Sequence, residues 1–211
     1  MTFRRTAIGI TAILFGFPVS LAIAQQTKTS TGSSSDSAMS KSKGGQPSAS
    51  DKKFMVSAAQ GGMAEVELGR LAVKQGKSDA VKQFGRHMID DHSKANEALM
   101  QLASQKHVTL PKTLNAKDKA LKSHLAKLSG AAFDKEFAAD MVKDHHQDIA
   151  EFQKEADQGK DPDVKSFASS TLPTLKMHLT MAESVKDGKA MPIDSSGDKG
   201  SAKEGTGTTK Q

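Results

Sequence analysis

The sequence predicts an all-α protein whose folded part is a four-helix bundle, with a short extra helix in the middle crossover and disordered termini. Three observations lead to this fold class. Between residues 51 and 187, apolar residues recur every three or four positions, which is the period of one helix face. Turn-forming residues cluster between these periodic stretches, where helices are expected to end. The sequence also lacks the period-two alternation of a half-buried β-strand.

Four rows of apolar residues define the long helices, which span 54–72, 81–102, 134–156 and 164–185 in chain order. Residues 76–79 (Gly-Lys-Ser-Asp) separate the first two helices and offer an N-cap to the second. Residues 108–115 contain a proline and end the second helix. A shorter helix is expected over 115–128, before the third long helix begins.

The last long helix has a clear start signal. Asp161 can cap it, and Pro162 occupies the first helical position, where a missing N–H is harmless. Pro173 lies further along the same row. We therefore expect either a kink at this proline or a later start of the helix.

Residues 1–24 are typical of a secretory signal peptide. Arg4 and Arg5 precede an apolar run over 7–21 that is short for a bilayer span, and residues 22–24 (Ala-Ile-Ala) form a small-x-small cleavage site. An uncleaved membrane anchor is the alternative. Because the sequence has no other apolar run of about 18 residues, we expect an exported, periplasmic protein without stable membrane insertion after cleavage.

The two ends of the chain differ in composition from its middle. Residues 25–50 and 188–211 are mostly small or polar, so we expect a disordered linker and a disordered tail around a 51–187 domain. That domain has 21 Lys and Arg against 20 Asp and Glu, so most of the net charge of +6 lies in the ends. A nearly neutral domain without a basic face argues against nucleic-acid binding. The sequence leaves a protein partner and self-association open.

The chain offers few groups for covalent catalysis. It contains no Cys, which excludes disulfides, thiolate zinc ligands and a thiol nucleophile. It also lacks the sequence motifs of serine nucleophiles, phosphate loops, dinucleotide sites and His-Glu-x-x-His zinc sites. The sequence therefore indicates no reaction, and a role without turnover is favoured over an enzyme.

One ionisable residue interrupts each apolar row, and these four are Glu65, His92, His145 and His178. A buried carboxylate or imidazole needs a partner, so we expect the four side chains to meet one another or a ligand. One carboxylate and three imidazoles, each from a different helix, could bind a divalent metal ion.

Three aspartates could support such a site by accepting hydrogen bonds from metal-bound imidazoles. Asp91 and Asp144 each precede a histidine, and Asp134 lies about three turns before His145 on the same face. The alternatives are a metal-free hydrogen-bonded core, or histidines that lie at the edge of the bundle.

Methionines introduce copper as a second possibility. Met88 and Met141 each lie four residues before a candidate histidine and share its helix face. Thioether and imidazole donors together suit Cu(I), whereas the simpler interpretation is that methionine fills gaps in the core. The cofactor expected, if one binds, is a single divalent or copper ion.

Several separated motifs resemble the bacterial "domain of unknown function 4142" family. They are AAQGGMAEVELG at 58–69, MIDDH at 88–92, GAAFD at 130–134 and LPTL at 172–175, with His145 and His178. The resemblance covers about 53–185 and implies a ferritin-like helical bundle that is typically exported. It also implies that Glu65, Asp91, His92, Asp134, His145 and His178 occupy the characteristic polar positions of the family.

The chain departs from the expected pattern in two ways. Phe137 stands where the family often has Tyr. Ferritin-like di-iron proteins use Glu-x-x-His on two helices, and neither Glu-x-x-His nor Asp-x-x-His occurs in this sequence. Di-iron chemistry is therefore not expected.

Three functions from different classes remain open at this stage. The first is a periplasmic binding or protective protein that holds a metal ion without turnover. The second is a structural or envelope-associated interaction module with a metal-free polar core. The third is a redox metalloenzyme.

Overall fold

The computed structural model describes residues 46–192, and its helices are α1 (Ala49–Gln75), α2 (Asp79–Gln105), α3 (Ala116–Leu125), α4 (Gly130–Gln158) and α5 (Pro162–Lys186). The expected signal peptide, most of the expected linker and most of the expected tail lie outside the described residues. Helix α1 begins two residues inside the range expected for the linker. No helix within 46–192 is long and apolar enough to cross a membrane.

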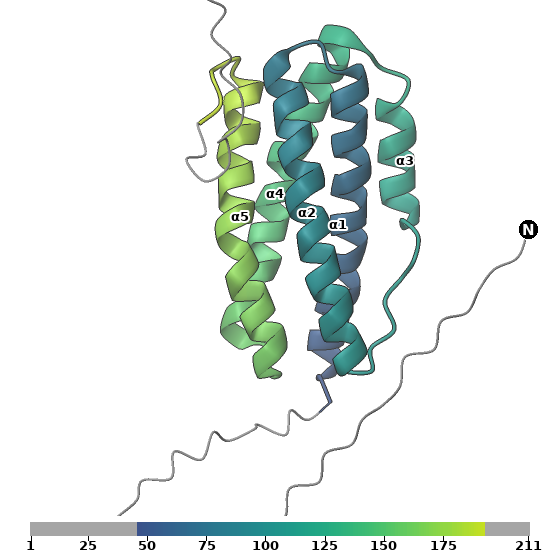
Figure 1. The fold of residues 1–211 in the computed structure, drawn as a ribbon, viewed down its shortest axis with the longest axis vertical. Coiled ribbons are helices and arrows are strands. Elements are labelled where there is room, and N and C mark those ends of the chain that lie inside the picture. The colour runs from purple at the N-terminus through teal and green to yellow at the C-terminus, as the bar shows by residue number, and fades with distance from the viewer. Residues whose placement is uncertain (1–45, 193–211) are drawn as a thin grey trace, which may run out of the picture. The chain divides into compact units, whose positions relative to one another are not determined.

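The four long helices form two hairpins that pack into one bundle. Helices α1 and α2 pair along their length, as do α4 and α5, and the pairs meet through α2 with α5 and α1 with α4 (Figure 1). The short helix α3 lies in the crossover between the hairpins, against the outer side of α1 (Figure 1). The predicted four-helix bundle with an extra crossover helix is therefore confirmed.

Capping residues start these helices, as the sequence predicts for α2 and α5. The side chains of Ser78 and Asn115 accept hydrogen bonds from backbone N–H groups in the first turns of α2 and α3. Asp161 caps α5 in the same way, and Pro162 is its first residue. Helix α5 runs through Pro173, so its start is not shifted by that proline. These local signals explain why the helix boundaries could be read from sequence.

Two apolar clusters make up the core, one toward each end of the bundle. Phe54, Leu99, Phe152 and Leu175 belong to the first cluster, and Leu68, Met88, Met141 and Met181 belong to the second. On every long helix, the polar residue predicted to be buried falls between the residues of these two clusters. A polar layer therefore divides the core, and one residue from each long helix contributes to it.

Glycines allow α1 and α2 to approach closely on both sides of this layer. A Cβ on Gly69 would lie 2.7 Å from the carbonyl oxygen of Gly85, and a Cβ on Gly85 would lie 2.7 Å from that of Gly69. A Cβ on Gly62 would lie 2.2 Å from Oδ1 of Asn96. A larger residue at Gly69 or Gly85 would meet backbone atoms and force the helices apart, whereas at Gly62 it would first displace the Asn96 side chain. The glycines therefore keep Glu65 within reach of His92.

Candidate metal centre

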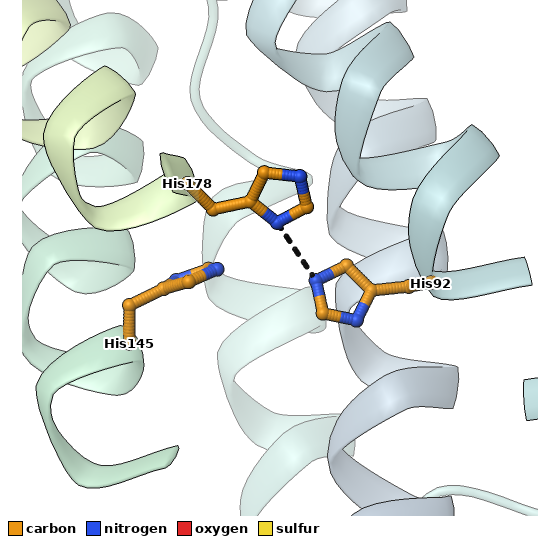
Figure 2. A group of neighbouring side chains, drawn as sticks. All are labelled: His92, His145 and His178. Atoms are coloured by element: carbon orange, nitrogen blue, oxygen red, sulfur yellow. Dashed lines mark hydrogen bonds between the residues drawn. The ribbon is translucent and has the colours of Figure 1, made fainter. Parts of the chain in front are cut away.

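The polar layer brings together Glu65 of α1, His92 of α2, His145 of α4 and His178 of α5. All four side chains are buried, with relative exposures of 4% or less. The three histidine rings point toward one another from three different helices (Figure 2). The structure thus places all four residues singled out by helical periodicity at one depth in the bundle.

Each imidazole has one ring nitrogen in contact with a polar group outside the triad. His145 Nδ1 donates to the carbonyl oxygen of Met141 at 3.0 Å. His92 Nδ1 lies 2.9 Å from Glu65 Oε2, and His178 Nε2 lies 3.0 Å from Asp91 Oδ2. Metal-binding histidines characteristically donate their second ring N–H to a carboxylate or a backbone carbonyl in this way.

The other nitrogen of each ring faces the interior of the triad. His92 Nε2 and His178 Nδ1 lie 3.2 Å apart and share a hydrogen bond, drawn as a dashed line in Figure 2. His145 Nε2 has no hydrogen-bond partner although it is fully buried. The ligand atoms that the three histidines can offer lie within 4.8 Å of one another.

These separations suit a tetrahedral metal ion. Two nitrogens bound to zinc at about 2.0–2.1 Å with tetrahedral angles are about 3.3–3.4 Å apart. The 3.2 Å between His92 Nε2 and His178 Nδ1 is already close to that value. The orphaned Nε2 of His145 supplies a third donor, and the three histidines each offer a ligand atom within 4.8 Å of the others.

Burial also sets the protonation state that metal binding requires. Desolvation lowers the pKa of His92 to about 4 and holds the pKa of His145 well below its usual value. Desolvation lowers the pKa of His178 as well, against the opposing effect of its hydrogen bond to Asp91. All three imidazoles are therefore neutral near pH 7, with lone pairs available to a metal ion.

The pKa of Glu65 is shifted in the opposite direction from the pKa values of the histidines. Desolvation and the nearby Asp144 raise the pKa of its carboxyl well above the usual value. The chain from Glu65 through His92 and His178 to Asp91 contains two hydrogen bonds and the 2.9 Å contact between Glu65 Oε2 and His92 Nδ1, whereas two neutral imidazoles supply only two N–H groups for these three links. A protonated Glu65 that donates to His92 Nδ1 provides the third hydrogen and agrees with the raised pKa.

The predicted aspartates have three different positions. Asp91 contacts His178 as expected for a supporting acceptor. Asp144 instead approaches Glu65, together with Asp148, which the sequence analysis did not single out. Asp134 accepts hydrogen bonds from the backbone N–H groups of Lys77 and Ser78 in the turn between α1 and α2.

The position of Asp134 has a simple geometric reason. Eleven residues of helix separate it from His145, which corresponds to about 16 Å along the axis. The two residues share a helix face but lie at different depths, so the carboxylate of Asp134 joins the turn and not the histidines. Asp148, by contrast, follows Asp144 by one helical turn, and this i,i+4 pair of acids was the signal that could have identified it.

Apolar residues surround the triad, and a small cavity lies beside it. The ring of Phe84 packs against His145 and His178, with centroids 6.3 and 6.1 Å away. Met88 and Met141 belong to the same apolar cluster as Phe84, as expected of methionines that fill a core. A cavity of about 20 Å³, enough for one water-sized molecule, is lined by Glu65, His92 and other residues.

The fold and the side chains together define a small helical-bundle protein with a buried histidine triad. The chain belongs to the DUF4142 family, a domain of unknown function whose family model matches residues 36–185. This confirms the resemblance seen in the sequence.

A solved structure with a similar fold is described as "Crystal structure of DUF305 fragment from Deinococcus radiodurans". It aligns with a TM-score of 0.61 and 12% identity, over 68% of this chain and 99% of that chain. At this identity the similarity establishes the fold alone. A comparison with curated proteins gives no match.

Proposed function

We propose that this protein is an exported metal-binding bundle that holds one transition metal ion through His92 Nε2, His145 Nε2 and His178 Nδ1. One observation carries the proposal. Each buried imidazole has one nitrogen held by a polar group outside the triad and directs the other into a common centre. A bundle that needed only a filled core would not require three neutral imidazoles to be oriented in this way.

The donor set favours a borderline ion over a hard one. Three imidazole nitrogens suit Zn²⁺, Cu²⁺ or Ni²⁺, whereas Ca²⁺ and Mg²⁺ prefer oxygen. Zn²⁺ is the best match because the site approaches tetrahedral separations. Three protein ligands leave one coordination position of a tetrahedral ion for a water molecule. The role proposed is binding without turnover.

Export rests on the sequence of the first 24 residues. Arg4 and Arg5, the apolar run over 7–21 and the small residues at 22–24 support cleavage by signal peptidase. A periplasmic location suits a centre made of histidines, because imidazole ligation does not depend on a reducing environment as thiolate ligation does.

A metal-free structural core is the second candidate, and one contact favours it. The hydrogen bond between His92 Nε2 and His178 Nδ1 already satisfies two of the three inward nitrogens. In this alternative, the polar layer sets the register of the helices and binds no ion. His145 Nε2, which no group satisfies, is the observation that this alternative leaves unexplained.

Thermal unfolding of chelator-treated protein against added Zn²⁺ separates the two candidates. Zn²⁺ at 100 times its dissociation constant should stabilise the fold by about 2.7 kcal/mol. For a domain of this size, that corresponds to a rise in Tm of about 5–10 °C. His145→Ala should lose the rise, whereas His146→Ala, which removes an exposed neighbour with 61% side-chain exposure, should keep it.

The result that contradicts metal binding is equally clear. If no transition metal ion raises the Tm while His145→Ala still destabilises the protein, the layer is a structural network. Replacement of Zn²⁺ by Co²⁺ adds an independent readout, because tetrahedral Co²⁺ absorbs strongly in the visible range. Wild-type protein should show this absorption, and His145→Ala should not.

A further inference from the structure

A second group of ligand-type side chains lies on the other side of Glu65. One carboxylate oxygen from each of Glu65, Asp144 and Asp148 lies within 4.8 Å of the others. Helix α1 supplies the first residue and α4 supplies the other two. Asp144 and Asp148 are half-buried, so this acidic triad is reached from solvent while Glu65 closes it from the core side.

No positive side chain neutralises the acidic triad. Among residues 46–192, no Lys or Arg lies within 4.0 Å of any of the three carboxylates. The charged groups of the surrounding elements include Lys117 and Asp118 of α3 and Asp140 of α4, so more acid than base surrounds the triad. Three carboxyl groups this close in a partly desolvated position need a proton or a cation among them.

An orphaned atom points to the cation. Glu65 is 1% exposed, and its Oε1 has no hydrogen-bond partner. His145 Nε2 lies 3.4 Å from this oxygen and is itself unpartnered. A neutral His145 whose Nδ1 donates to Met141 has no hydrogen at Nε2, so it cannot satisfy this oxygen.

We propose that Glu65, Asp144 and Asp148 form a second site, for a hard divalent cation of the Ca²⁺ and Mn²⁺ class. Two oxygens that bind one ion at about 2.4 Å are no more than about 4.8 Å apart, and each carboxylate of the triad has an oxygen within this limit of the other two. All of its donors are carboxylate oxygens, the ligands that these ions prefer. Glu65 then has two separate tasks: its Oε2 contacts His92, and its unpartnered Oε1 is the oxygen left for the cation.

The acidic site does not depend on metal binding by the histidine triad. Its ligands would take a different class of ion, and only Glu65 is common to both. Mn²⁺ is a selective probe, because it binds nitrogen ligands least well among the divalent first-row ions while carboxylates accept it readily.

The test is a Mn²⁺ titration of chelator-treated full-length protein, followed by the loss of the free-ion electron paramagnetic resonance signal. Wild-type protein should bind about one Mn²⁺, and Ca²⁺ should displace it. Asp148→Asn and Asp144→Asn keep the side-chain shape and should each weaken binding at least tenfold. Asp157→Asn removes an exposed acid from the same helix and should leave binding unchanged.

Two further measurements keep the outcome decisive. Circular dichroism of each variant shows that loss of binding is not loss of folding. His178→Ala should retain Mn²⁺ while it loses Zn²⁺, so failure of either site is visible separately. The proposal is overturned if wild-type protein binds neither Mn²⁺ nor Ca²⁺ at millimolar concentration, or if Asp157→Asn lowers the affinity as much as Asp148→Asn does.

Discussion

Zn²⁺ binding to the histidine triad at pH 7 should displace a proton from Glu65. In the metal-free protein, two hydrogen bonds and the 2.9 Å contact between Glu65 and His92 link Glu65, His92, His178 and Asp91, and we expect the Glu65 carboxyl to supply the third hydrogen. A metal ion that takes His92 Nε2 and His178 Nδ1 removes the bond between the rings. The two N–H groups that remain then serve Glu65 and Asp91 as carboxylates, so about one proton should leave per ion bound.

Titration calorimetry in two buffers with different ionisation enthalpies measures this proton number. Glu65→Gln provides the matched variant, because an amide can donate to His92 Nδ1 without metal and accept from it with metal. Its proton release should fall to about zero. Its Zn²⁺ affinity should fall about 10–100-fold, the usual effect of altering a group that orients a ligating histidine. Wild-type protein that binds Zn²⁺ with no proton release would refute the hydrogen-bond count.

Three other predictions concern stability and processing. Asp51 is buried and accepts hydrogen bonds from the backbone N–H groups of Ser48, Lys160 and Asp161. Asp51→Ala should therefore lower the free energy of unfolding by about 2–4 kcal/mol. Urea unfolding should show this as a lower midpoint. An unchanged midpoint would show that water replaces the carboxylate. Because burial lowers the pKa of His92 to about 4, the unfolded state binds more protons between about pH 6.5 and pH 4. The free energy of unfolding of metal-free protein should then decrease as pH falls through this window, by about 3 kcal/mol from His92 alone. Urea unfolding at pH 7 and pH 5 should record about 2 kcal/mol of this change, and a slope that His92→Gln does not reduce would contradict it. N-terminal sequencing of periplasmic protein should begin at Gln25, and a chain that still begins at Met1 in the membrane fraction would contradict cleavage.

Local sequence determined the helices and most of their boundaries. A Ser, Asn or Asp cap acts on backbone N–H groups two or three residues away, so its effect does not depend on the rest of the fold. The same local period identified Glu65, His92, His145 and His178, because a polar residue on an apolar face is visible without knowledge of its neighbours. That these four helices pack around one another followed from the need to bury four apolar rows.

Only the tertiary structure decided what each polar group contacts. The depth and rotation of each helix determine which ring nitrogen faces the triad, and these depend on packing between helices, such as the close approach of Gly69 to Gly85. Asp134 shares a face with His145 but not a depth, and it therefore joins a turn. Asp148 entered the acidic triad because α4 brings it beside Glu65 of α1. Contacts between residues far apart in the chain depend on interhelical geometry, which helical periodicity does not encode.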